Sequence, residues 1–174
     1  MSREYYSFWF RLDARDGYLI YISNETDGSV TDDNGNVPYF LYTGNLLQYA
    51  SALGLTVDAE SPNLTDLDIL DTWLESNDGE KIDCKTFLDA WNLFDDLSKT
   101  VSGSFDPERK KTQKIYNKLF WGNNLPAVTP DGEHYIPSWT KRELNIMRKV
   151  LSEGLVLFRE RTTCVKTPTH PTNH

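Results

Sequence analysis

Cysteine and histidine are scarce in this chain of 174 residues, which contains two cysteines and three histidines. Cys84 and Cys164 are too few and too far apart for a disulfide framework or a four-ligand zinc site. We interpret both as free thiols, with a single bridge between them as the alternative. Phosphate-binding glycine loops, the dinucleotide fingerprint, the nucleophile elbow and the His-Glu-x-x-His motif are missing too. The sequence therefore predicts a protein that is not an enzyme and that carries no cofactor and no metal ion.

Long hydrophobic runs are also missing. No stretch of about 18 apolar residues occurs, which is the length that a membrane-spanning helix needs. The opening "MSREYYSFWF" lacks the basic region, the apolar core and the cleavage site of a signal peptide. We therefore expect a cytoplasmic protein with no membrane partner. Its 39% hydrophobic and 13% aromatic content is enough for a substantial core.

Positive charge is the minority, with 18 lysines and arginines against 26 acids and a net charge of -8. The imbalance is uneven along the chain: residues 1–57 carry -4, residues 58–106 carry -10, and residues 107–174 carry +6. Either the acidic and basic parts face each other in the fold, or one of them faces a partner of opposite charge. The sequence leaves both explanations open.

The order of the expected elements is strands first and helices afterwards, which is typical of the α+β class. The aromatic-rich segments 5–12 and 17–23 predict a β-hairpin, and residues 37–43 predict a third strand. We expect this N-terminal antiparallel sheet to pack against four or five helices in a single domain, residues 1–161, followed by a flexible tail, residues 162–174. Caps and hydrophobic periodicity place the helices at 44–54, from 65 onward, at 83–101, at 107–121 and at 140–160.

The stretch "TDLDILDTWLESNDGEKIDCKTFLDAWNLFDDL" (65–97) combines many acids with many core-type side chains. A helical wheel for residues 83–101 separates the two kinds. The inner sector contains Cys84, Phe87, Leu88, Ala90, Trp91, Phe94, Leu97 and Val101. The opposite sector contains Asp89, Asn92, Asp96 and Lys99. Asp95 falls in the apolar sector. Either it lies at the solvated edge of that sector, or an Arg or Lys pairs with it, or this face contacts a partner.

Other kinds of chemistry are weakly supported. The register of "SNDGEKIDCK" does not fit a calcium loop, because Lys85 would stand where a carboxylate must be. A looser carboxylate site in a metal-dependent hydrolase stays an alternative. A lysine face between Lys110 and Lys118 could hold phosphates, but the acidic protein would repel nucleic acid, so we expect no direct nucleic-acid binding.

The stretch "CKTFLDAWNLFDDLSKTV", the segment "IYNKLFWGNNLPAVTPDGEHYIP" and the closing "LSEGLVLF" together resemble immunity proteins of bacterial contact-dependent growth inhibition and related polymorphic toxin systems. The resemblance covers about the last half of the chain. It implies a small acidic α+β protein that binds one cognate toxin domain, in many cases a nuclease, and blocks it. It carries over no residue role.

An acidic surface would steer a basic partner toward itself. We therefore expect a nuclease-like basic toxin domain as the partner, and an adaptor module that binds through an apolar groove as a further alternative. The acids would make charge-assisted hydrogen bonds to the toxin. Two tryptophans, each near the end of a helix, would anchor it, with a place in the ordinary core as the alternative for both. The predicted contact residues are Asp66, Asp68, Asp71, Trp73, Glu75, Asp78, Glu80, Asp83, Asp95 and Trp121.

Overall fold

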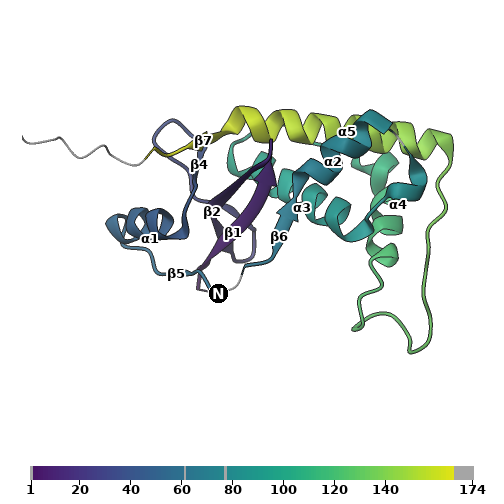
Figure 1. Cartoon of the computed structure of the whole chain (residues 1–174), viewed down its shortest axis with the longest axis horizontal. Coiled ribbons are helices and arrows are strands. Elements are labelled where there is room, and N and C mark those ends of the chain that lie inside the picture. Colours follow the sequence, from purple (N-terminus) through teal and green to yellow (C-terminus); the bar gives the residue numbers. More distant parts are fainter. Residues whose placement is uncertain (1, 61, 77, 167–174) are drawn as a thin grey trace, which may run out of the picture.

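A computed structural model describes residues 2–60, 62–76 and 78–166, together with all their side chains except that of Glu80. Residues 167–174, most of the expected tail, lie outside the described part. Within it the chain forms seven strands and five α-helices in an elongated arrangement (Figure 1). The strands are β1 (Glu4–Leu12), β2 (Arg15–Ser23), β3 (Gly28–Ser29), β4 (Val37–Phe40), β5 (Val57–Asp58), β6 (Leu64–Asp66) and β7 (Thr162–Cys164). The helices are α1 (Thr43–Ala52), α2 (Leu67–Ser76), α3 (Cys84–Thr100), α4 (Arg109–Gly122) and α5 (Lys141–Arg161), with a short 3₁₀ turn, η1, at Gly79–Lys81.

The α+β class and the N-terminal hairpin are confirmed, but the sheet is larger than predicted. Its order is β5-β1-β2-β4-β7, with β3 also paired to β2 and β6 to β1. β1 and β2 pair antiparallel over their whole length, whereas β5, β6 and β7 add as parallel strands. The sheet is therefore mixed rather than antiparallel. The expectation of a tail from residue 162 is wrong for Thr162–Cys164, which hydrogen-bonds to β4.

The hairpin turn is held by a carboxylate from a distant part of the chain. Asp13 and Ala14 both have positive φ, 54° and 58°. Asp68 of α2 accepts hydrogen bonds from the two backbone N–H groups of this turn, at 2.7 and 2.9 Å. A two-residue turn with positive φ at both positions matches the right-handed twist of the strands that it joins. Asp68 therefore fixes the position of the hairpin against the helical layer.

Replacing Ala14 by glycine is expected to raise the free energy of unfolding by about 1 kcal/mol, because an L residue in the left-handed region costs roughly 1–2 kcal/mol that glycine avoids. Urea unfolding of the variant against the parent measures this. The same substitution at Ala52, in the last turn of α1, is the control and should lower stability. An Ala14→Gly variant no more stable than the parent would show that the turn is not strained.

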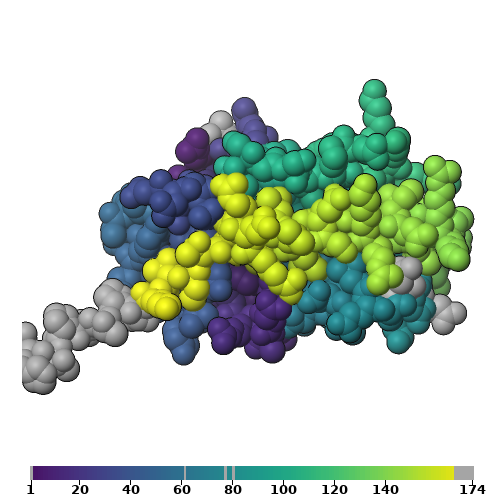
Figure 2. All heavy atoms as spheres, turned by 90° about the horizontal axis from the view of Figure 1, so that it is seen from above, coloured from purple at the N-terminus to yellow at the C-terminus, as the bar shows by residue number. Residues whose placement is uncertain are grey.

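The main core lies between the helices and one face of the hairpin. Phe94 of α3 packs against Phe158 of α5, with ring centroids 6.4 Å apart, and Phe158 packs edge-on against Phe10 of β1 at 4.9 Å. Seen from above in Figure 2, α5 crosses the molecule with α2 on one side and the α3–α4 region on the other. These aromatic contacts join the helical layer to the sheet. None of the described helices is long and apolar enough to cross a membrane.

The central helix α3 is buried on more sides than the helical wheel predicts. Leu93 is buried, although it lies outside the predicted inner sector. Asp96, assigned to the solvent face, instead accepts a 2.8 Å hydrogen bond from the hydroxyl of Tyr21 on β2. Burial raises the pKa of Asp96, and the Tyr21 hydrogen bond opposes that rise. The prediction for Asp96 is wrong because α3 contacts the sheet as well as α2, α4 and α5.

A second, smaller core lies under α1. Ile20, Phe40, Leu46 and Ala50 are buried there, apart from the main core. Around them α1 and its flanks leave a set of large apolar side chains exposed: Leu41, Tyr42, Leu47 and Leu53. This "α1 patch" lies at the end of the molecule farther from the loop that joins α4 to α5 (Figure 1).

Candidate functional site

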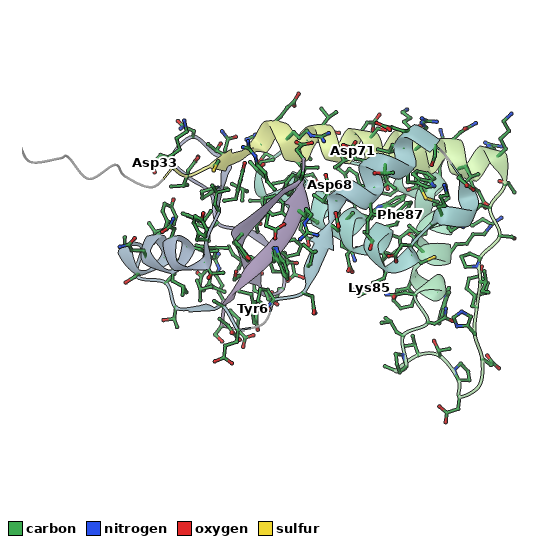
Figure 3. The ribbon with its side chains drawn as sticks, viewed as in Figure 1. Tyr6, Asp33, Asp68, Asp71, Lys85 and Phe87 are labelled. Atoms are coloured by element: carbon green, nitrogen blue, oxygen red, sulfur yellow. The ribbon has the colours of Figure 1, made fainter. Side chains whose placement is uncertain are left out.

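The first acids of the predicted interface tie the fold together. Asp66 at the end of β6 pairs with Arg11 at 3.6 Å. Asp68 holds the hairpin turn, and Asp71 pairs with Arg159 of α5 at 2.8 Å. Figure 3 places Asp68 and Asp71 beside this turn, where α2, α5 and the hairpin meet. The three carboxylates thus have partners within the chain, and the function proposed below does not depend on them.

The later acids differ in their surroundings. Asp95 is half-buried between Lys99, at 2.9 Å, and Arg109, which donates to both of its oxygens. This confirms the prediction that an Arg or Lys of the same chain pairs with Asp95. Asp83 is exposed and caps α3 by accepting hydrogen bonds from the N–H and hydroxyl of Thr86.

The remaining predicted acids lie near the end of α2. Asp78 is half-buried, with Lys81 at 3.9 Å. Glu75 is exposed, close to the end of its helix. The side chain of Glu80 lies outside the described part of the chain.

The two predicted aromatic anchors, Trp73 and Trp121, differ in their exposure to solvent. Trp73 is 2% exposed, packs edge-on against Phe87 and donates its indole N–H to the Asp78 carbonyl at 2.8 Å. The expectation that Trp73 contacts a partner is therefore wrong, because it belongs to the core. Trp121, at the end of α4, is 49% exposed and packs only one edge against Phe120. Of the two, Trp121 alone is placed to meet a partner.

Trp121 stands at the start of the most prominent surface feature, the loop 122–139 between α4 and α5, which we call the arm. The arm extends away from the helical layer and returns to the start of α5 (Figure 1). Turns fold its outer part: the N–H of Thr129 donates to the Leu125 carbonyl at 3.0 Å, and the N–H of Glu133 donates to the Pro130 carbonyl at 3.1 Å. Gly132, with φ of 81°, allows the second turn.

Polar contacts join the two legs of the arm close to its root. The Asn124 side-chain amide donates to the carbonyls of Gly122 and Tyr135, at 3.0 and 2.9 Å, and its oxygen accepts from the N–H of Tyr135 at 2.7 Å. The legs also pack closely on α3: a Cβ added at Gly122 would lie 2.6 Å from Cys84 Sγ and 3.0 Å from Pro137 Cγ. The arm is therefore attached to the helical layer by specific side-chain contacts.

An ion pair secures the returning leg. Lys118 of α4 donates to Glu143 and to the Ser138 carbonyl, each at 2.8 Å, and lies 5.4 Å from the ring centre of Trp139. Glu143 also completes the capping box of α5 with Thr140. Burial raises the pKa of Glu143, but the hydrogen bonds from Lys118 and Thr140 outweigh burial and hold the pKa below its ordinary value. The Glu143 carboxylate is therefore ionised at neutral pH.

The arm carries an unusual amount of exposed apolar surface. Ile136 is 77% exposed, and the other large apolar side chains open to solvent here are Trp121, Leu125, Val128 and Tyr135. Contiguous exposed apolar surface on a folded domain commonly marks a binding site. Aromatic residues such as Trp121 and Tyr135 are also the types enriched at binding hot spots.

Two hollows adjoin this apolar surface. The first, about 860 Å³, lies between the root of the arm, the start of α3 and η1, with Asp83, Lys85, His134, Pro137 and Trp139 on its walls. The second, about 670 Å³, lies within the arm itself and is lined by Trp121, Asn124, Val128, Thr129, Pro130, Glu133, His134 and Tyr135. Both volumes fall in the range of ligand-binding cavities, about 300–1,000 Å³. Figure 3 shows Lys85 near the root of the arm.

One thiol, that of Cys84, lines the first hollow. Cys84 and Cys164 are both free thiols, as predicted. Burial raises the pKa of the Cys84 thiol, and the charge of Asp83 adds to the rise. A raised pKa lowers the fraction of reactive thiolate. Among the described residues, no group of three or more His, Cys, Asp or Glu side chains is placed to hold a metal ion.

The contact residues predicted from the sequence include Trp121 and Asp83 but no residue of the arm. A usable signal was present: Leu125, Val128, Tyr135 and Ile136 are large apolar residues in a segment with three prolines and no helical or strand period. Apolar residues that no regular element can bury either fill a local core or stay exposed. Distinguishing these outcomes requires the tertiary structure.

Comparison with known proteins gives information on the fold alone. No family model and no curated protein matches the chain. A solved structure, the crystal structure of the SatS C-terminal domain in complex with bromine, is similar with a TM-score of 0.60 and 12% sequence identity. The match covers 94% of this chain and 94% of that one. Since identity is this low, the likeness extends to the α+β fold and to nothing that the SatS domain binds.

Proposed function

We propose that this protein is an immunity-type inhibitor, which binds a basic toxin domain and neutralises it without catalysing a reaction. The observation that carries the proposal is the arm, where Trp121, Tyr135 and Ile136 stay exposed beside the open carboxylates of Asp131 and Glu133. Aromatic anchors give a protein interface its affinity. Surrounding acids favour a basic partner and speed its association.

The placement of the acids supports a smaller proposed interface than the set of contact residues predicted from sequence. Acids at the hairpin end have intramolecular partners, whereas Glu75, Asp131 and Glu133 form no ion pair within the described chain. All three lie toward the end of the molecule that carries the arm. The toxin would therefore meet the arm and the neighbouring end of α2.

The first experiment is the capture of a partner from the native host by the tagged full chain, followed by purification of that partner. Support requires a toxic domain whose activity, for instance nuclease activity, is silenced by this protein at a one-to-one ratio. Capture of a protein whose activity is unchanged would contradict the proposal. Thermal unfolding with and without Mg²⁺ or Ca²⁺ tests the alternative of a metal-dependent hydrolase, which requires stabilisation by the metal.

The double variant Glu75→Lys/Asp131→Lys is expected to slow association with the toxin roughly tenfold at low ionic strength, because it removes steering charge beside the arm. Stopped-flow mixing over a range of salt concentrations measures the rate, and the difference should shrink as salt screens the charges. The matched control, Glu25→Lys/Asp33→Lys, makes the same change in net charge; Figure 3 shows Asp33 at the opposite end of the molecule. Equal slowing by both variants would place the interface elsewhere.

An adaptor function is favoured by one separate observation, the α1 patch. Leu47→Ser/Leu53→Ser on this patch should leave toxin silencing unchanged. If these substitutions abolish partner capture while the arm variants do not, binding depends on the apolar surface of α1 and the adaptor alternative replaces the inhibitor.

A further inference from the structure

The hollow within the arm is lined by aromatic, apolar and acidic side chains. Two exposed aromatic side chains line it, Trp121 from the last turn of α4 and Tyr135 from the returning leg of the arm. Glu133 lines it as well, as the one carboxylate among its walls, and this carboxylate forms no ion pair or side-chain hydrogen bond within the described chain. Val128 and Pro130 supply apolar surface beside them.

Aromatic faces and an open carboxylate in one hollow are complementary to an organic cation. The face of an aromatic ring is electron-rich and attracts a cation within about 6 Å, with tryptophan the strongest of the aromatic residues. A guanidinium group suits this arrangement better than an ammonium group, because it is planar, stacks on rings and meets a carboxylate through two parallel N–H donors. Lys118, near the base of the arm, pairs with Glu143 rather than with Glu133.

The arrangement is held in place before any ligand arrives. Trp121 extends the last turn of α4 and rests edge-on against Phe120, with ring centroids 5.2 Å apart. Tyr135 is fixed through both of its backbone groups by Asn124, at 2.7 and 2.9 Å. Glu133 lies at the end of the turn that Pro130 and Gly132 form. A tryptophan ring already packed on a neighbour and a backbone already held in position lose less conformational entropy on binding.

We propose that this hollow is a receptor for one arginine side chain of the protein partner, with the guanidinium between the rings of Trp121 and Tyr135 and its N–H groups donating to the Glu133 carboxylate. The proposal rests on the proposed function only in taking the partner to be a protein with a basic surface. It converts the general preference for positive charge into a single specificity-determining contact.

A pair of small probes tests the receptor without the partner. N-acetyl-arginine methylamide and N-acetyl-citrulline methylamide have nearly the same shape, but only the first carries a positive charge. In ¹⁵N-labelled full-length protein, the indole N–H resonance of Trp121, assigned by Trp121→Phe, is expected to shift with the arginine probe and not with the citrulline probe. No shift with either probe, or equal shifts with both, would overturn the proposal.

Substitutions show which side chains of the hollow bind the arginine probe. Trp121→Leu should weaken arginine-probe binding about tenfold, whereas Trp121→Phe should retain part of it, because the phenyl ring still presents a face. Glu133→Gln is expected to weaken binding several-fold. Its matched control is Asp131→Asn. This substitution also removes one negative charge, two residues before Glu133 in the chain, but the Asp131 side chain does not line the hollow. If Asp131→Asn has the same effect as Glu133→Gln, the attraction is general charge and the receptor does not exist.

The two proposals fail separately. A toxin that is silenced equally well by the Trp121→Leu variant would overturn the arginine receptor and leave the inhibitor intact. A hollow that discriminates arginine from citrulline, in a protein that silences no toxin, would leave the receptor intact and overturn the inhibitor.

Discussion

Replacing Gly154 by alanine is expected to lower the free energy of unfolding by about 2–3 kcal/mol, although helix propensity alone favours alanine by about 1 kcal/mol. A Cβ at this position would lie 2.1 Å from the Phe94 ring, far inside van der Waals contact. Phe94 cannot retreat easily, because it is fully buried and packs against the rings of Phe105 and Phe158. Thermal unfolding should show a decrease in Tm of about 5–10 °C.

The control is the same substitution at Gly44, in the first turn of α1, where an added Cβ would meet nothing within 4 Å. Gly44→Ala should leave stability unchanged or raise it slightly. The double variant Gly154→Ala/Phe94→Leu should recover part of the loss, because the smaller side chain makes room for the methyl group. A Gly154→Ala variant as stable as the parent would mean that α5 does not cross α3 at this short distance.

Some features of the fold follow from local signals in the sequence, and others depend on tertiary contacts such as this crossing. Local signals sufficed for the start of α3, capped by Asp83, and for the capping box of α5. They also sufficed for the hairpin, whose two strands are rich in aromatic residues and contain nine residues each. The strands β3 and β5–β7 contain two or three residues each, too few for any period to appear. Their formation depends on neighbours that only the folded chain brings together.

The candidate site, too, could be predicted from the sequence only in part. The sequence identified an acid-rich segment correctly, but charge alone does not show whether a carboxylate has an intramolecular partner. Asp71 and Asp95 pair with Arg159 and Arg109, which lie 88 and 14 residues farther along the chain. The charge asymmetry between the acidic middle and the basic C-terminal part is thus partly neutralised inside the fold. The first explanation offered by the sequence, that acidic and basic parts face each other in the fold, therefore applies to Asp71 and Asp95. The second, an oppositely charged partner, stays a prediction.

Removing Lys118 is expected to have the second large effect on stability. Lys118→Met leaves the buried Glu143 carboxylate with Lys114, 3.7 Å away, and with the Thr140 N–H. Breaking a buried ion pair by removing one partner costs about 3–5 kcal/mol. Because Lys114 remains, we expect about 2–3 kcal/mol at pH 7, measured by urea unfolding. The matched control, Lys110→Met, changes an exposed lysine on the same helix and should cost less than about 0.5 kcal/mol.

The pH dependence identifies the cause of this loss. In the parent, the pKa of Glu143 is below its ordinary value, so the pair stabilises the fold above the pKa of the unfolded chain, and this contribution is lost as the pH falls through the lower folded pKa. In Lys118→Met, burial is no longer outweighed, so the pKa of Glu143 should rise and the carboxyl group should take up a proton at a higher pH. The difference in stability between the two proteins should therefore shrink as the pH falls from 7 toward about 4.

A second substitution separates the buried charge from the loss of the lysine itself. Lys118→Met/Glu143→Gln removes the charge while glutamine retains the capping box, so its stability at pH 7 should exceed that of Lys118→Met alone. A gap that stays constant with pH, or a double variant that recovers nothing, would show that the ion pair is not the cause. Lys118 also donates to the Ser138 carbonyl on the returning leg of the arm. If the partner is the proposed toxin domain, both variants should therefore weaken its binding, even though Trp121, Tyr135 and Glu133 are unchanged. The lysine would then act on recognition only through the position of the arm.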